Sequence, residues 1–314
     1  MRPDAAKLSC EWNLNQLALS YGELSLFMDL ESGACQHLRW TQKANDKPVD
    51  LLSWSQFQPT NMPFEVGSFV LVPYSNRLFD SKLLSPSGTF TLPANYPSSN
   101  VPVHGLGWRK KWQCVTREPQ RVVLVYSHLS DDHWPFAHNC EQTVTLNQGQ
   151  VEFHLKVKNI GEQPMPAGLG FHPWFALDHA SQVRFGPTSV WLQDERGWPT
   201  VKTSSSGLEN FDFTEWRSAQ TVIQNHCHSD WSGRADLHLH EKKLSIQLTA
   251  SSNLNHLIVY RKPGQDWLCL EPVSHATGAF SLPHVKMSQA GDHLLAPGDS
   301  MEAWMRISVK PLTH

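Results

Sequence analysis

Two residues in this sequence occupy settings that suit proton transfer. His172 lies within residues 168–175 (GLGFHPWF), where neighbouring aromatic side chains would desolvate the imidazole and lower its pKa. Glu271 ends an apolar run, residues 267–270, and is followed at once by Pro272. If Glu271 is buried there, its pKa is raised and its carboxylate is a stronger base than a surface one. The two residue types together suit acid–base catalysis, with a core histidine and a solvated strand end as the structural alternatives.

Two further segments carry groups that suit the binding of a polar ligand. Arg77 follows Asn76 in a proline-containing segment, where its guanidinium can present a fixed fork of donors or form a structural ion pair. His104 precedes Gly105 in residues 103–108 (VHGLGW), and the two glycines of this segment permit a close backbone approach. A histidine and a tryptophan in one such turn can face a ring-shaped ligand, although a loop histidine without a role is also common.

A metal site is not predicted. Residues 225–228 (NHCH) look like a ligand cluster, but adjacent side chains on a strand point to opposite faces, so that only His226 and His228 would share a face. No third or fourth ligand stands nearby at metal-site spacing. The sequence also has no glycine-rich phosphate loop, so we expect no nucleotide cofactor either.

The elements that must position these residues read as strands. Residues 151–158 alternate apolar and polar side chains, as a half-buried strand does, and residues 147–150 (NQGQ) predict a hairpin to a similar strand at 142–146. Other predicted strands cover residues 16–20, 121–127, 244–248, 256–260, 267–270 and 301–309. Helical periodicity is nearly absent, and 21 prolines and 18 glycines interrupt the chain. We therefore predict an all-β protein, a large antiparallel β-sandwich with few short helices, formed by residues 1–314 as a single domain.

Composition narrows the classes of function. The net charge of -3 provides no basic excess for a phosphate backbone, so nucleic acid is not an expected partner. No stretch resembles a signal peptide or approaches the roughly 20 apolar residues of a membrane span. The six cysteines are scattered without close pairs, which favours reduced thiols and a cytoplasmic location.

Five short motifs in this order resemble the aldose 1-epimerase (galactose mutarotase) family, over most of the chain from about Leu17 onward: Asn76-Arg77, His104-Gly105, residues 170–173 (GFHP), residues 271–274 (EPVS) and residues 295–300 (LAPGDS). The resemblance implies a galactose mutarotase-like supersandwich with a sugar in an open cleft. It also implies that His172 is the general acid, that Glu271 is the general base, and that Arg77 and His104 bind the sugar. Asn76 and the aromatic Trp174 beside these motifs are further expected sugar contacts.

The implied reaction is the interconversion of the α and β anomers of a hexose through ring opening and reclosure, with no metal and no cofactor. Family members usually carry an aspartate in the segment that ends here at residues 231–235 (WSGRA), and Asn225 stands at that position. Asn225 lacks the negative charge of that aspartate and would repel an anionic ligand less. An alternative interpretation is therefore a mutarotase for an anionic sulfo- or phospho-sugar, bound by Arg77 or by the basic run at residues 109–111. Another reading is a non-catalytic carbohydrate-binding protein that kept the cleft. In each case we expect a small-molecule sugar as the partner and a monomer or homodimer.

Overall fold

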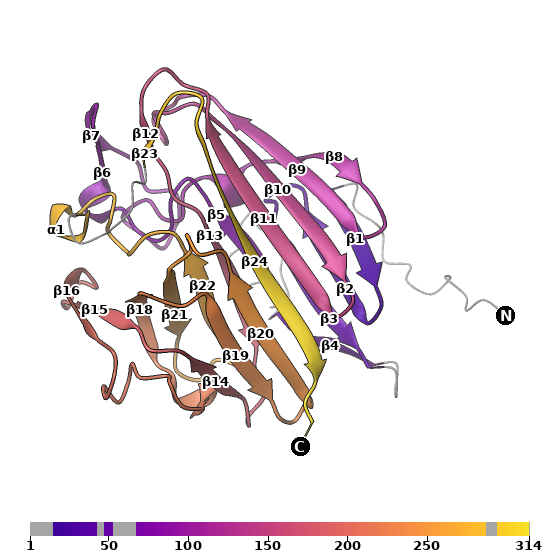
Figure 1. The fold of residues 1–314 in the computed structure, drawn as a ribbon. Helices are drawn as coiled ribbons and strands as arrows, with labels where there is room; N and C mark the ends of the chain where they lie inside the picture. Colours follow the sequence, from indigo (N-terminus) through magenta and orange to yellow (C-terminus); the bar gives the residue numbers. More distant parts are fainter. Residues whose placement is uncertain (1–14, 43–46, 53–66, 287–293, 314) are drawn as a thin grey trace.

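Two large antiparallel sheets form the molecule (Figure 1). The computed structural model describes residues 15–42, 47–52, 67–286 and 294–313. The eleven-stranded sheet runs in the order β1 (Gln16–Tyr21), β2 (Leu24–Asp29), β3 (Cys35–Thr41), β5 (Ser68–Leu71), β13 (Gly170–Ala176), β22 (Trp267–Val273), β21 (His256–Arg261), β18 (Gln224–Ser229), β15 (Ser189–Gln193) and β16 (Pro199–Ser204), with β4 (Pro48–Asp50) paired to β3. The nine-stranded sheet runs in the order β17 (Arg217–Ser218), β14 (Gln182–Phe185), β19 (Arg234–Leu239), β20 (Leu244–Ala250), β24 (Ser300–Pro311), β11 (Gln150–Asn159), β10 (His138–Asn147), β9 (Arg121–His128) and β8 (Gln113–Arg117).

Smaller elements connect the sheets. Two-stranded ribbons pair β12 (Met165–Pro166) with β23 (Leu294–Leu295), and β6 (Lys82–Ser85) with β7 (Gly88–Thr91). The helical segments are short, namely α1 (Pro283–Lys286), η1 (Phe79–Ser81), η2 (Gly107–Arg109) and η3 (Ala219–Thr221). In the described part of the chain, no helix has the length and apolar character needed to cross a bilayer.

The core lies between the two sheets. Alternate residues of β11 are buried, and Phe153 of this strand meets Phe171 of β13 in the other sheet, with ring centroids 6.4 Å apart. Each large apolar side chain buried in this way stabilises the fold by roughly 1.5–3 kcal/mol. On the nine-stranded sheet the intervening polar residues face outward, whereas the outward face of the eleven-stranded sheet carries a second buried apolar cluster that includes Phe69, Trp108 and Ile258. The predicted all-β sandwich is confirmed.

The predicted strands are largely confirmed. The β10–β11 hairpin has Leu146 opposite Val151, as the alternating pattern indicated. The strand predicted at 267–270 was placed too short, because β22 continues through Glu271 and Pro272 to Val273. A proline is tolerated inside this strand because its hydrogen-bonding to β13 is interrupted at that point.

Candidate active site

The interruption between β13 and β22 is what brings His172 and Glu271 together. Gly170 lies opposite Val273, and Trp174 lies opposite Cys269. Continued between these pairs, the register places His172 opposite Glu271. Regular pairing is absent here because a proline stands beside each of the two residues, one on each strand, and proline has no N–H to donate. Residues directly opposite on neighbouring antiparallel strands have side chains on the same face, close enough to touch.

The two side chains do touch. His172 Nε2 lies 3.3 Å from Glu271 Oε1, and the residues are only 3% and 2% exposed. Burial lowers the pKa of His172 to about 3. Burial also raises the pKa of Glu271 well above its ordinary value, while the positive charge of Arg77 acts in the opposite direction. Both shifts favour uncharged groups, so the pair holds one proton between them over a wide range of pH.

Aromatic rings fix the plane of the imidazole. Phe69 stacks on His172 with a centroid distance of 4.6 Å, and Trp174 stacks with a centroid distance of 5.0 Å and an interplanar angle of 10°. Among the described residues, no hydrogen-bond partner is found for His172 Nδ1, Trp174 Nε1 or Glu271 Oε2. A buried polar atom without a partner is costly, and its presence beside a cavity is typical of a site built for a polar ligand.

A second polar group approaches from the loops at the edge of this sheet. The backbone N–H of Asn76 donates to His104 Nδ1 at 3.1 Å, and the N–H of His104 donates back to the Asn76 carbonyl at 2.9 Å. Since Nδ1 accepts, the proton of the neutral imidazole lies on Nε2. Burial lowers the pKa of His104 well below its ordinary value, with nearby His172 and Arg77 acting in the same direction. His104 is therefore a neutral donor at physiological pH.

Backbone strain and a buried network hold this loop in place. Asn76 and His104 have φ values of 58° and 60°, a region that non-glycine residues adopt at a cost and that clusters at functional sites. Behind the loop, His275 Nε2 accepts the N–H of Ser75 at 3.2 Å, and its Nδ1 lies 3.2 Å from Ser274 Oγ. This network ties the segment bearing Arg77 to the end of β22.

The cross-strand row next to the His172–Glu271 pair brings Trp174, Tyr260 and Asn225 to the cavity. Trp174 lies opposite Cys269, Cys269 opposite Tyr260, and Tyr260 opposite Asn225, so four strands contribute one residue each. Asn225, from β18, thereby reaches the same face as residues far from it in sequence.

These groups surround a cavity of about 440 Å³, within the usual range for a small-molecule site. All seven residues that the sequence suggested contribute to its lining, namely Asn76, Arg77, His104, His172, Trp174, Asn225 and Glu271. The sequence did not indicate six others, namely Tyr96, Ser98, Ser99, Val103, Tyr260 and Lys262. Tyr260 ends the predicted strand 256–260, but residues 257–259 are all apolar and give no alternation that would assign Tyr260 to a face, and which strands lie next to each other is not readable from one sequence.

Two other sequence features lie elsewhere. The basic run at residues 109–111 does not line the cavity: Arg109 donates to the Asn95 carbonyl at 2.7 Å, and Lys111 pairs with Glu31. The expectation that this run receives an anionic group is therefore wrong. His228 is buried, with its ring nitrogens 2.9 Å from Thr188 Oγ1 and 3.2 Å from Gln224 Oε1, and so it is structural.

One set of residues could hold a metal ion. The ligand atoms of His172, Cys269 and Glu271 all lie within 4.8 Å of one another, and nitrogen, sulfur and oxygen ligands are those that Zn²⁺ accepts. A cation there would occupy the atoms that share the proton, so metal binding and acid–base action at this pair exclude each other.

Comparison with known proteins agrees with this geometry. A family model described as aldose 1-epimerase matches residues 36–308. The chain belongs to the aldose 1-epimerase family. Protein YphB of Escherichia coli (strain K12) is 26% identical over 254 residues, covering 78% of this chain and 84% of that protein. Protein YihR of the same organism is 23% identical over 232 residues, covering 71% of this chain and 75% of that protein.

Solved structures show the same fold. A galactose mutarotase-like protein from Clostridium acetobutylicum superposes with a TM-score of 0.79 at 19% identity, covering 94% of this chain and 95% of that one. A GalM/aldose epimerase homologue from C. elegans gives the same TM-score at 16% identity, covering 95% and 99%. The galactose mutarotase-like sandwich implied by the sequence motifs is therefore confirmed for this member of the aldose 1-epimerase family.

Proposed function

We propose that this protein is a mutarotase that interconverts the α and β anomers of a hexose. In the proposed cycle the sugar enters the cavity with its anomeric hydroxyl at Glu271 and its ring oxygen at His172. Two groups 3.3 Å apart can reach two oxygens bonded to one carbon. His104 and Arg77 hold the other hydroxyls.

The proton count of the pair matches the reaction. In the ionised form, Glu271 is a carboxylate and His172 an imidazolium. The carboxylate takes the proton of the anomeric hydroxyl, the imidazolium gives its proton to the ring oxygen, and the bond between the anomeric carbon and the ring oxygen breaks. The product is an open aldehyde beside a neutral carboxylic acid and a neutral imidazole, which is the form that burial favours. Rotation of the aldehyde and the reverse transfers close the ring on its other face.

The single observation that carries this proposal is the contact between His172 and Glu271 at the floor of the cavity. Its test is polarimetry on freshly dissolved α-glucose and α-galactose. A mutarotase accelerates the approach to the equilibrium rotation for at least one sugar. A carbohydrate-binding protein without catalysis binds the sugar and leaves the rate unchanged, and that result would refute the proposal.

Arg77 is expected to contribute mainly to binding. Its side chain is exposed at the cavity, and a guanidinium fork binds sugar oxygens with charge-assisted hydrogen bonds. We expect Arg77→Ala to raise KM by about tenfold, which corresponds to ~1.4 kcal/mol, with a smaller change in kcat. Arg77→Lys is the matched control, since it keeps the charge and loses the fork. The KM of the parent and of both variants is measured by polarimetry, and an unchanged KM for Arg77→Ala would exclude Arg77 as a sugar contact.

Charge around the cavity favours a second candidate function, mutarotation of an anionic sugar. Arg77 and Lys262 line the cavity, whereas Glu271 is the only acidic residue among its described lining. Asn225 adds no negative charge at the position where the family usually has an aspartate. A sulfonate or phosphate on the sugar would therefore meet two cations across a neutral floor.

Comparison of hexose 6-phosphate with the parent hexose tests this second candidate. For an anionic-sugar mutarotase, kcat/KM is higher for the phosphate, and added salt reduces the difference. Lys262→Gln should lower the preference for the phosphate by about tenfold and leave the neutral sugar nearly unaffected. Equal kcat/KM for both sugars would leave the neutral hexose as the substrate.

A further inference from the structure

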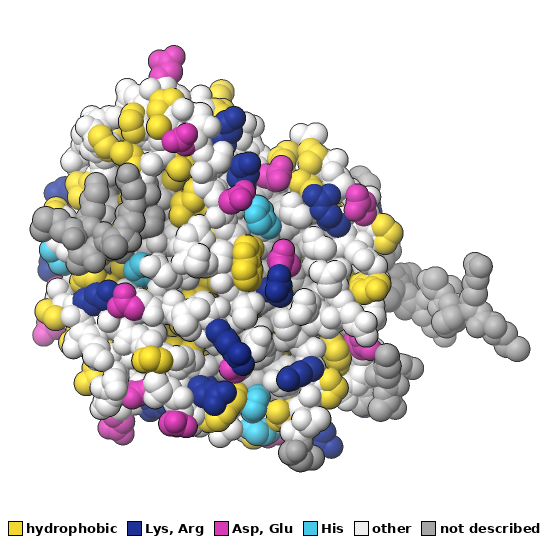
Figure 2. Space-filling view, in the orientation of Figure 1, with side chains coloured by type: hydrophobic (Ala, Val, Ile, Leu, Met, Phe, Trp, Pro, Cys, Tyr) yellow, Lys and Arg dark blue, Asp and Glu magenta, His cyan; other side chains and the backbone are white. Residues whose placement is uncertain are grey.

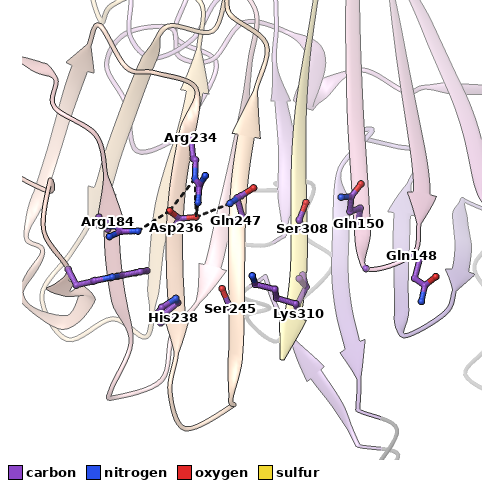
Figure 3. A pocket seen from close by; sticks show the side chains of 13 residues that line it. Gln148, Gln150, Arg184, Arg234, Asp236, His238, Ser245, Gln247, Ser308 and Lys310 are labelled. Carbon is purple, nitrogen blue, oxygen red and sulfur yellow. Dashed lines mark hydrogen bonds and ion pairs between the residues drawn. The ribbon is translucent and has the colours of Figure 1, made fainter. Parts of the chain in front are cut away.

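A second hollow lies on the outward face of the nine-stranded sheet (Figure 3). It has a volume of about 480 Å³. One cross-strand row runs along it with a residue from each of β14, β19, β20, β24 and β11, in the order Arg184, Asp236, Gln247, Ser308 and Gln150. The adjacent row contributes His238, Ser245 and Lys310. The hollow therefore crosses five neighbouring strands.

The shape of this groove follows from side-chain size. On the two middle strands the short residues Ser245 and Ser308 alternate with Gln247 and Lys310, and Arg184 stands at one end of the groove and Gln148 at the other (Figure 3). Trp216 lies against Arg184. Five strands spaced by about 4.8 Å span roughly 19 Å. That length exceeds one hexose ring and suits a chain of several.

The groove carries a positive balance of charge. Arg184, Arg234 and Lys310 line it together with one carboxylate, Asp236. That carboxylate is already shared, because it accepts from Arg234 and from Gln247 and lies 3.7 Å from Arg184. Lys and Arg side chains gather over β14, β19, β20 and β24 on this face of the molecule (Figure 2).

One of the cations is held in place before any ligand arrives. The guanidinium of Arg184 lies 4.6 Å from the ring centroid of Trp216, and His238 stacks on the same tryptophan with a centroid distance of 3.9 Å. A cation fixed by an aromatic ring and a carboxylate loses little entropy when it binds an anion.

We infer that this groove is a second binding site, for an acidic oligosaccharide that carries carboxylate or sulfate groups. The cations meet the acidic groups, and the amides and hydroxyls of Gln148, Gln150, Gln247, Ser245 and Ser308 meet sugar hydroxyls. Three cations, one carboxylate and neutral polar groups match a ligand of low charge density better than a nucleic acid, and the whole chain has a net charge of -3. The flat polar floor also offers no pocket for the apolar side chains of a peptide.

The groove and the candidate active site are on opposite sides of the sandwich. Groove residues alternate along β19 and β20 with Leu237 and Ile246, which face the core. His172 alternates on β13 with Phe171, which faces the core from the other sheet. Ligands at the two sites therefore do not compete, and the groove can anchor the protein to an acidic polymer while the cavity binds a single sugar.

Isothermal titration calorimetry on the full-length protein tests the site, with tetragalacturonate and a sulfated heparin-derived tetrasaccharide as acidic probes. Maltotetraose and a short single-stranded RNA serve as comparison probes. We expect submillimolar binding of at least one acidic tetrasaccharide, weakened by salt and at least tenfold tighter than binding of maltotetraose or RNA. Binding of neither acidic probe, equal binding of maltotetraose, or tighter binding of RNA would overturn the proposal.

Variants locate the binding in the groove. Ser308→Trp fills the middle of the floor and should abolish binding, and Lys310→Ala should weaken it about tenfold. Lys158→Ala is the matched control, because Lys158 is an exposed lysine on the same sheet outside the groove. Glu271→Gln should bind the acidic probe as the parent does, and Ser308→Trp should leave the rate in polarimetry unchanged. Loss of binding in Lys158→Ala, or full binding in Ser308→Trp, would show that the groove is not the site. The binding results do not depend on whether the protein is a mutarotase.

Discussion

Glu271→Gln is expected to lower kcat for mutarotation by at least about two orders of magnitude, the usual contribution of one acid–base group. Glutamine keeps the shape of the side chain and its place 3.3 Å from His172, but it cannot take the proton of the anomeric hydroxyl. His172→Asn should cause a loss of similar size, because the ring oxygen then leaves without a proton. Since the two groups act as one unit, the double variant should be little slower than either single variant.

Cys269→Ala provides the matched control for this experiment. Cys269 is fully buried on the same strand as Glu271, two residues away and on the same face, but it has no part in the proposed proton transfers. We expect its kcat to stay within about threefold of the parent value. A large loss in Cys269→Ala would favour a metal held by His172, Cys269 and Glu271. Retention of most activity in Glu271→Gln would exclude Glu271 as the base.

The same Glu271→Gln change should stabilise the fold as the pH rises. Below the ordinary glutamate pKa of 4.5, the carboxyl is protonated in both the folded and the unfolded chain. Above it, the unfolded chain ionises freely, whereas burial keeps the folded pKa raised, so stability is lost as the pH rises toward that folded value. The glutamine variant does not lose stability in this way, because the glutamine side chain does not ionise. The melting temperature of the variant should match that of the parent near pH 4 and exceed it at pH 8, because each unit by which burial raises the folded pKa costs the parent about 1.4 kcal/mol. A constant difference across this range would contradict the burial argument.

Sequence patterns captured the fold because they record which face of each strand is buried. The alternation in residues 151–158 is the pattern of β11, with Val151 and Phe153 in the core. The same reasoning failed at residues 267–270, where Pro272 suggested an end to the strand. A proline inside a strand is compatible with a sheet only if its neighbour does not need the missing N–H, and this neighbour, β13, also carries a proline there. That condition involves two segments about a hundred residues apart, so neither segment reveals it alone.

In the candidate site, too, local sequence context predicts some residues, whereas others depend on the pairing of distant strands. His172 and Glu271 could be singled out from local context, because an aromatic neighbourhood and a carboxylate after an apolar run are visible in the sequence. Lys262 could not, because it stands just beyond a strand end and reaches the cavity only through the pairing of β21 with β18 and β22. The groove on the nine-stranded sheet could not be predicted from the sequence for the same reason. Its residues are ordinary outward-facing positions of separate strands, and only the register between the strands aligns them in rows.

Gly105→Ala is expected to have the largest effect on both stability and binding. Gly105 has a φ of +66°, and a Cβ there would lie inside van der Waals contact of the Val72 carbonyl and 2.7 Å from the nitrogen of Pro73. That carbonyl accepts the N–H groups of Leu106 and Gly107 at 2.8 and 3.0 Å, which holds the His104 loop against the segment bearing Asn76. The added methyl group must push Gly105 away from the Val72–Pro73 backbone, because backbone atoms cannot move aside as the end of a flexible side chain can. We expect a loss of about 3 kcal/mol or more in the free energy of unfolding, measured by urea denaturation, and a KM raised by more than tenfold.

Gly22→Ala separates the clash from the backbone strain. Gly22 has a nearly equal φ of +58°, but a Cβ there meets nothing within 4 Å. Its substitution should lower the free energy of unfolding by about 1–2 kcal/mol, the cost of holding an alanine in the left-handed conformation, and leave KM unchanged. The difference between the two variants then measures the contribution of the close approach at Val72 alone. Equal losses of stability, or an unchanged KM in a folded Gly105→Ala protein, would show that the position of His104 does not depend on this contact.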